Sequence, residues 1–134
     1  MPQGIIGPQG VTVITPVARE KYSKVAQLTA ADGSTGFAAF GLPMNAVVVG
    51  VYAISAGANT TQTINVGFTN GGTDLVSSYA PNSTGFAAVG AAAGASVGVQ
   101  LTADKTVYVK ASATLTNSVT VIVDYWVVPV GQGY

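Results

Sequence analysis

The feature that most constrains this chain is a two-residue hydrophobic alternation in its C-terminal third. Successive side chains of a β-strand point to opposite faces of a sheet, so a period of two predicts strands with one apolar side. The pattern predicts strands at 96–102, 105–113 and 117–130, with a turn at Ala103-Asp104, and we expect them to be adjacent. The apolar positions on one side are Val97, Val99, Leu101, Val107, Val109, Ala111, Ala113, Val119, Val121, Val123, Tyr125 and Val127.

The opposite side of these strands is mixed in character, because Tyr108, Lys110, Ile122, Asp124 and Trp126 all fall on it. We expect such a side to meet something besides water. Tyr108 and Trp126 are predicted to share one surface patch, which suits a sugar platform, a subunit interface or an ordinary second core layer. Asp124 is either a solvated break that limits strand aggregation or a buried partner for a neighbouring subunit.

Shorter strand patterns fill the rest of the chain. Residues 45–54 form a nearly continuous apolar run, which predicts a strand covered on both faces. Residues 60–69 alternate and end at Asn70-Gly71-Gly72, a strong turn signal. Further strands are predicted at 11–18, 24–30 and 37–40, with turn chemistry at Asp32-Gly33-Ser34. The side chains expected to face the core are Ala26, Leu28, Ile64, Val66 and Phe68.

The hexapeptide Ser-Thr-Gly-Phe-Ala-Ala occurs twice, at 34–39 and again at 83–88. An apolar strand pattern follows each copy, although the registers match poorly beyond the repeat. Two interpretations stay open: the copies are equivalent edge segments of a sandwich, or they are a coincidence in a sequence of low complexity.

The combined pattern predicts an all-β protein. Turn signals separate roughly seven to nine short strands rich in β-branched residues, and only brief segments keep helical spacing. We expect one antiparallel β-sandwich at 11–134, with either a jelly-roll or an immunoglobulin-like topology. A chain of 134 residues can bury a sizeable core without disulfides.

Residues 1–10 have a different pattern, with glycine at every third position. Collagen-like triple helices need this spacing, but so few triplets do not form one alone. We expect an extended N-terminal arm that reaches a neighbouring molecule, the alternative being a floppy terminus. The residues expected to make the contact are Pro2, Gln3, Ile5, Ile6 and Pro8.

The composition removes most catalytic chemistry. Histidine and cysteine are both absent, so the commonest general base and the usual nitrogen and sulfur metal ligands are missing. The five acidic residues are scattered singly. The run from Asn70 to Asp74 is better explained as a hairpin loop than as a calcium loop. We predict no enzyme activity, no metal and no cofactor.

Charge is scarce and balanced. Charged residues make up 7% of the chain, and five basic residues offset five acidic ones. Phosphate binding draws on clustered Lys and Arg, and the only cluster, Arg19, Lys21 and Lys24, is interrupted by Glu20 and fits a solvated loop. We therefore predict no nucleic-acid partner. A surface with so little charge favours burial in an oligomer or a larger assembly; the alternative is a Thr/Ser/Asn-rich surface that is soluble by itself.

Membrane insertion and export are not expected. The longest apolar stretches fall short of the roughly 18 residues that a spanning helix needs. The sequence around Met1 to Gly4 lacks the basic region and apolar run of a secretory signal, which weakens a bacterial surface or pilus subunit as a third reading.

Two stretches carry a resemblance to a known class of protein. The run that begins at Asn45, NAVVVGVYAISAGANTTQTINVGFTNGGTDLVSS, and the run that begins at Thr102, TADKTVYVKASATLTNSVTVIVDYWVVP, resemble small phage virion proteins that decorate or cement icosahedral capsids. The resemblance extends in style from Lys24 onward. It implies a β-sandwich, commonly trimeric, located on the capsid surface and bridging subunits of the major capsid protein. It assigns no contact residue.

The alternative function is a carbohydrate-binding module on a phage head fibre or tail, active in host attachment. Exposed aromatic side chains would hold the glycan. Trp126 is the residue on which this alternative chiefly depends.

Overall fold

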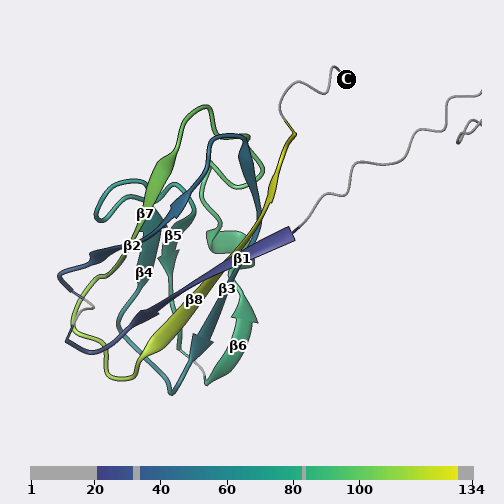
Figure 1. Ribbon diagram of the computed structural model, residues 1–134. Coiled ribbons are helices and arrows are strands. Elements are labelled where there is room, and N and C mark those ends of the chain that lie inside the picture. Colours follow the sequence, from purple (N-terminus) through teal and green to yellow (C-terminus); the bar gives the residue numbers. More distant parts are fainter. Residues whose placement is uncertain (1–20, 32–33, 83, 130–134) are drawn as a thin grey trace, which may run out of the picture.

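The computed structural model describes residues 21–31, 34–82 and 84–129 (Figure 1). Within them lie eight strands and one short 3-10 helix, and no helix there is long and apolar enough to cross a membrane. The predicted arm at 1–10, the strand at 11–18 and the turn residues Asp32 and Gly33 lie outside the described residues. The elements are β1 (Lys21–Leu28), β2 (Phe37–Leu42), β3 (Ala46–Ser55), β4 (Ile64–Gly67), β5 (Val76–Tyr79), β6 (Gly85–Ala88), η1 (Gly90–Ala92), β7 (Lys105–Ala111) and β8 (Val119–Val127).

The strands form two four-stranded antiparallel sheets. The first sheet has the order β1-β8-β3-β6 and the second the order β2-β7-β4-β5. The first strand pairs with the last, β2 with β7, β3 with β6 and β4 with β5. A ribbon of paired strands wrapped in this way is a jelly roll. The predicted all-β sandwich is confirmed, and its topology is the jelly roll, not the immunoglobulin-like alternative.

The predicted adjacency of the C-terminal strands is wrong. Strand β7 lies between β2 and β4 in the second sheet, whereas β8 lies between β1 and β3 in the first. Residues 96–102 form turns and one isolated bridge from Gln100 to Val47 instead of a strand. The alternation was strongest in β7 and β8 because both are central strands with one side in the core. A period of two shows which side of a strand is buried, but not which strands pair.

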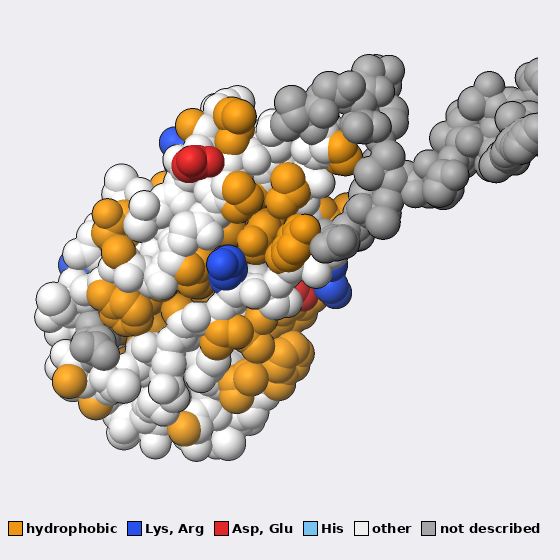
Figure 2. Space-filling model, viewed as in Figure 1, with side chains coloured by type: hydrophobic (Ala, Val, Ile, Leu, Met, Phe, Trp, Pro, Cys, Tyr) orange, Lys and Arg blue, Asp and Glu red, His pale blue; other side chains and the backbone are white. Residues whose placement is uncertain are grey.

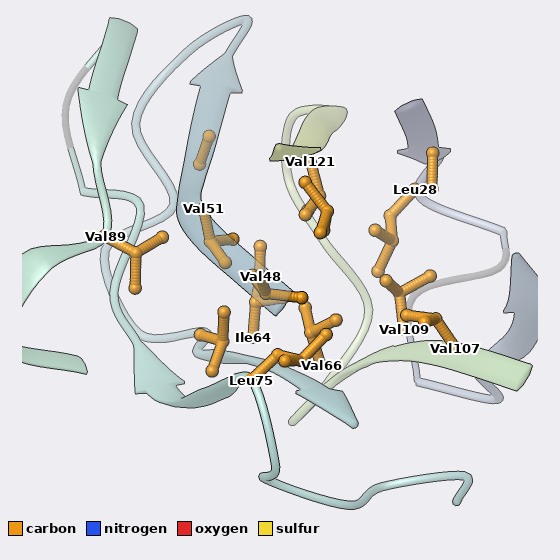
Figure 3. Close-up of a cluster of buried hydrophobic side chains, with 14 of the residues drawn as sticks. Leu28, Val48, Val51, Ile64, Val66, Leu75, Val89, Val107, Val109 and Val121 are labelled. Atoms are coloured by element: carbon orange, nitrogen blue, oxygen red, sulfur yellow. The ribbon is translucent and has the colours of Figure 1, made fainter. Parts of the chain in front are cut away.

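The core lies between the sheets and is built mainly from valine and leucine (Figure 3). Strands β7 and β8 contribute the buried alternating positions Val107, Val109, Val119, Val121 and Val123. The prediction that Ala26, Leu28, Ile64 and Val66 face the core is confirmed. Phe68 is partly buried and packs against the core as predicted, whereas the predicted inward positions Val99 and Ala113 are exposed.

Strand β3 departs from its predicted environment. Its inner side is buried, but Val49 and Ile54 on the other side are 45% and 39% exposed, so the prediction of cover on both faces is wrong for the single chain. The register with β8 shifts between Val48 and Gly50. Val48 and Val51 are three positions apart, so regular alternation would place them on opposite sides of the strand. The bulge adds one residue and allows both to face the core.

The edge strands include the repeated hexapeptide. Its first copy ends within β2 at the edge of the second sheet, and its second copy contains the whole of β6 at the edge of the first. Gly36 and Gly85, the equivalent glycines, have φ angles of +75° and +110°, values that favour glycine. Both copies therefore contribute to edge strands, one in each sheet. Strand β1 is also an edge. Lys21 lies in this strand and not in the predicted loop, while Lys24 lies in a strand as the pattern at 24–30 predicted, and both side chains are exposed; lysine is common on edge strands.

A fully buried asparagine ties two loops together at one end of the sandwich. Asn59 Oδ1 accepts the backbone N–H groups of Thr116 and Asn117 at 2.9 Å each. Its Nδ2 donates to Ser55 Oγ at 3.3 Å and to the Gly57 carbonyl oxygen at 3.5 Å. One side chain thus joins the loop after β3 to the loop that crosses from β7 to β8.

Candidate interaction surfaces

The outer side of the first sheet carries a cluster of apolar side chains, which it shares with the polar residues Ser23, Gln27 and Thr120. In register across the strands, Val25 of β1 lies beside Ile122 of β8, which lies beside Tyr52 of β3. One row further on, Ile54 of β3 pairs with Phe86 of β6. Figure 2 shows hydrophobic side chains gathered over β3 and β6. We call this surface the apolar face and define it as Val25, Val49, Tyr52, Ile54, Phe86 and Ile122.

The side chains at the borders of the apolar face are its most exposed members. Val25 is 60% exposed and Phe86 is 63% exposed. The Phe86 ring stacks on the Tyr52 ring with centroids 5.2 Å apart, so the aromatic part of the face is fixed in place. Large apolar side chains exposed together, not singly, mark surfaces that contact another molecule.

Asp124 lies among these residues, but it is not solvated. Its residue is 8% exposed, its Oδ1 accepts the Ser23 hydroxyl at 2.5 Å, and its Oδ2 is 3.7 Å from Lys21 Nζ. The reading of Asp124 as a solvated break is therefore wrong. Its register partner on the other side is Gly50, which has no side chain to compete for the carboxylate. The carboxylate has its partners within its own chain.

A hollow of about 240 Å³ adjoins the apolar face at the β3 bulge. A Cβ at Gly50 would lie 2.8 Å from the Tyr52 hydroxyl, so glycine at this position leaves room for the tyrosine ring. The lining has no charged residue and consists of Val49, Gly50, Val51, Tyr52, Ala88, Val89, Gly90, Ala93 and Val97.

The outer side of the second sheet is polar by comparison. Its central strand β7 presents Thr106, Tyr108 and Lys110 between the buried valines. On the neighbouring β4, Asn65 Oδ1 accepts the Ser78 backbone N–H at 2.7 Å. The two outer sides of the sandwich therefore differ in chemistry, and only the first sheet presents an apolar surface.

Tyr108 and Trp126 do not form the predicted patch. Tyr108 is on β7 and Trp126 on β8, so the two half-buried side chains belong to different sheets and point to opposite outer sides of the sandwich. Trp126 lies in register with Lys21 and Val47 at the end of the apolar face. Tyr108 and Trp126 thus offer no shared aromatic platform.

A second hollow, of about 420 Å³, opens between the edge strands β1 and β2. Lys24 and Lys105 contribute basic side chains to it, while Asp104 contributes a carboxylate whose Oδ1 accepts the Met44 backbone N–H at 2.8 Å. Leu42, Pro43 and Tyr125 complete much of its wall. Sequence reasoning did not find this groove, because it arises where the edges of the two sheets separate.

The hairpin loop at Asn70 to Asp74 is held by its own hydrogen bonds. The Asp74 carboxylate accepts the Phe68 backbone N–H at 2.8 Å, and Gly72 N–H donates to the Thr69 carbonyl oxygen at 2.8 Å. Among the residues described, no group of three or more acidic side chains is arranged to hold a metal ion. The predicted contact residues Pro2, Gln3, Ile5, Ile6 and Pro8 lie outside the described part.

No family model and no curated protein matches this sequence. Three solved phage capsid structures contain chains of similar fold. The match in the cyanophage Pam1 capsid asymmetric unit has a TM-score of 0.55 at 20% identity and covers 96% of this chain and 100% of that chain. The match in the capsid of Ralstonia phage GP4 has a TM-score of 0.62 at 18% identity and covers 89% of this chain and 92% of that chain. The match in the acid-stable capsid of Helicobacter pylori bacteriophage KHP30 has a TM-score of 0.56 at 15% identity and covers 82% of this chain and 90% of that chain. At these identities the likeness shows a shared fold.

Proposed function

We propose that this protein is a structural component of a phage virion, located on the capsid surface, where it decorates the shell and stabilises it by binding across subunits of the major capsid protein. The observation that carries the proposal is the fold. Chains in three phage capsid structures share it over at least 82% of this chain and at least 90% of their own.

The chemistry of the described residues is consistent with a protein that covers surface. The chain has few charges, no histidine and no cysteine, and its largest distinctive feature is the apolar face. An additional protein that spans a subunit boundary stabilises the shell because rupture must also separate the new interface. This role requires no catalytic step and no cofactor, and we propose neither.

We further propose that the protein acts as a homo-oligomer, with a trimer favoured. Low net charge and an exposed apolar sheet leave a single copy poorly protected against association. A closed ring of copies would bury this surface in the same way for each copy.

The direct test is binding of the purified protein to shells assembled from the major capsid protein alone. We expect co-sedimentation at a fixed ratio to the shell subunit, together with a higher rupture temperature measured by calorimetry. Shells whose rupture temperature does not change at full occupancy would contradict stabilisation, and absence of co-sedimentation would contradict the proposal itself.

The N-terminal arm is tested by deleting residues 2–9, which contain Pro2, Gln3, Ile5, Ile6 and Pro8. We expect weaker attachment to shells and an unchanged thermal unfolding transition, because the described sandwich begins at Lys21. A matched control replaces residues 2–9 with a Gly/Ser segment of equal length. Unchanged shell occupancy after the deletion would contradict a role for the arm.

A further inference from the structure

We propose that Asn70 is a site of spontaneous deamidation, at which loss of the side-chain amide releases the β4–β5 loop from the turn that precedes β2. The proposal concerns a covalent change in the chain itself, so it depends neither on shell binding nor on self-association. It rests on one turn, Thr69 to Gly72, and on the contacts of its asparagine with Thr35 and Gly36.

The first reason is the residue that follows Asn70. Deamidation begins when the backbone nitrogen of the next residue attacks the asparagine side chain. Glycine hinders this attack least, because it has no Cβ beside its nitrogen. The asparagines of the chain are Asn45, Asn59, Asn65, Asn70, Asn82 and Asn117. Only Asn70 is followed by glycine, and its side chain is exposed, so water and hydroxide reach it.

The second reason is the geometry of the turn. The Gly72 N–H closes it by donating to the Thr69 carbonyl oxygen at 2.8 Å, and this bond does not use the Gly71 N–H. Gly71 has a φ angle of +84°, in the left-handed region that a type II turn requires at its third residue. The turn therefore favours glycine after Asn70 and leaves the attacking nitrogen without a hydrogen bond inside residues 69–72.

The chemical step balances with water as its only co-reactant. The Gly71 nitrogen bonds to Asn70 Cγ, the bond from Cγ to Nδ2 breaks, and Nδ2 leaves as ammonia with the proton that the Gly71 nitrogen gives up. Water then opens the resulting cyclic imide. Opening at Cγ gives aspartate, and opening at the main-chain carbonyl carbon gives isoaspartate. Either product adds a negative charge, and because hydrolysis does not restore the amide, modified copies accumulate.

The Asn70 amide joins two loops of the second sheet. Its Nδ2 donates to the Thr35 carbonyl oxygen at 3.1 Å, and its Oδ1 lies so close to Gly36 that a Cβ there would overlap it. The equivalent glycine of the second hexapeptide, Gly85, has no such neighbour, since a Cβ there would meet nothing within 4 Å. A carboxylate at position 70 has no N–H to donate to Thr35. Deamidation therefore removes this link between the loops.

The same link slows the reaction in the folded protein, because it holds the amide in one orientation. A single exposed hydrogen bond accounts for a factor of about ten at most. The test incubates the full-length protein at mildly alkaline pH, both folded and in guanidinium chloride, and follows every asparagine by peptide mass spectrometry. We expect Asn70 in the folded protein to convert at least tenfold faster than any other asparagine. We also expect its conversion to be no more than about tenfold slower than in denaturant.

Hydrogen exchange measures the loss of the link. We expect the peptide that contains Thr35 and Gly36 to exchange faster in aged protein and in fresh Asn70→Asp than in fresh wild-type protein. Asn70→Gln is the matched control, because it keeps an amide on a longer side chain that cyclises far more slowly. On isoelectric focusing, aged wild-type protein should gain an acidic band that aged Asn70→Gln lacks.

Three results would overturn the proposal. They are conversion of Asn70 no faster than that of Asn82 or Asn117, conversion in denaturant without conversion in the folded protein, and exchange around Thr35 that is unchanged in both aged protein and Asn70→Asp. The first two would show that the turn protects the amide from attack. The third would show that the hydrogen bond to Thr35 does not hold the loops together.

Discussion

Replacement of Asn59 by alanine should destabilise this protein more than the loss of any single polar contact on its surface would. Asn59 is fully buried, and its Oδ1 is the acceptor for two backbone N–H groups, those of Thr116 and Asn117. In the Asn59→Ala variant both groups lose this acceptor. No other hydrogen bond of the described residues joins the β3–β4 loop to these two amides.

The magnitude follows from these contacts. An N–H group left unsatisfied in a buried position costs about 1–3 kcal/mol. The bonds that Asn59 Nδ2 makes at 3.3 and 3.5 Å are at the long limit of hydrogen bonding, and they add little. Thr116 is exposed, which allows water to reach its amide in part. We therefore expect a loss of about 2–4 kcal/mol, a large fraction of the total stability of a small domain.

The measurement is urea-induced unfolding followed by tryptophan fluorescence, with the transition slope compared between variants to establish that the extent of unfolding is unchanged. Gln62→Ala is the matched control. Gln62 Nε2 donates to the carbonyl oxygen of Thr114 at 3.0 Å in the same loop, but in an exposed setting, so its loss should cost below about 1 kcal/mol. A loss at Asn59 no larger than that at Gln62 would refute the reasoning.

Two further predictions use the same assay. Gly94→Ala should destabilise the chain by about 1–3 kcal/mol, because a Cβ there would overlap the backbone carbonyl oxygens of Thr73 and Asp74, which cannot move as a side chain can; an unchanged midpoint would show that the segment shifts freely. Asp124→Ala should cost about 1.5–3 kcal/mol, because the buried carboxylate accepts the Ser23 hydroxyl, while its pair with Lys21, which is 57% exposed, is screened by solvent and adds little; a loss below about 0.5 kcal/mol would show that the carboxylate does not hold β1 against β8.

The sequence predicted burial better than it predicted pairing. Alternation in β1, β4, β7 and β8 correctly located the core side of each strand, because a strand that borders a core must place every second residue in it. Strand pairing depends on contacts between segments that are distant in the sequence. The alternation of apolar residues within one strand carries no information about those contacts. Strands β7 and β8 follow one another in the sequence, yet the chain crosses from one sheet to the other between Ser112 and Ser118.

The candidate surface was predicted only in part: the side of β8 with Ile122 was expected to meet something besides water, whereas the signal of β3 was interpreted as burial. A continuous apolar run such as β3 predicts cover on both faces, but it does not say whether the cover comes from the same chain or from another. The bulge at Val49 added a second difficulty, since it changes which positions share a face. The pairing of Asp124 with Ser23 and Lys21 could not be predicted, because it requires β1 to lie beside β8.

The pairing of the first strand with the last has a consequence for how the chain folds. Ser23 and Asp124 are 101 positions apart, and β8 is the strand that joins β1 to β3 in the first sheet. During synthesis β1 has no sheet to join until β8 has left the ribosome. Folds dominated by such distant contacts form slowly, in milliseconds to seconds. The jelly roll therefore completes its fold only once β8 has been made, and Val25 and Ile122 come side by side to form the apolar face only in the finished domain.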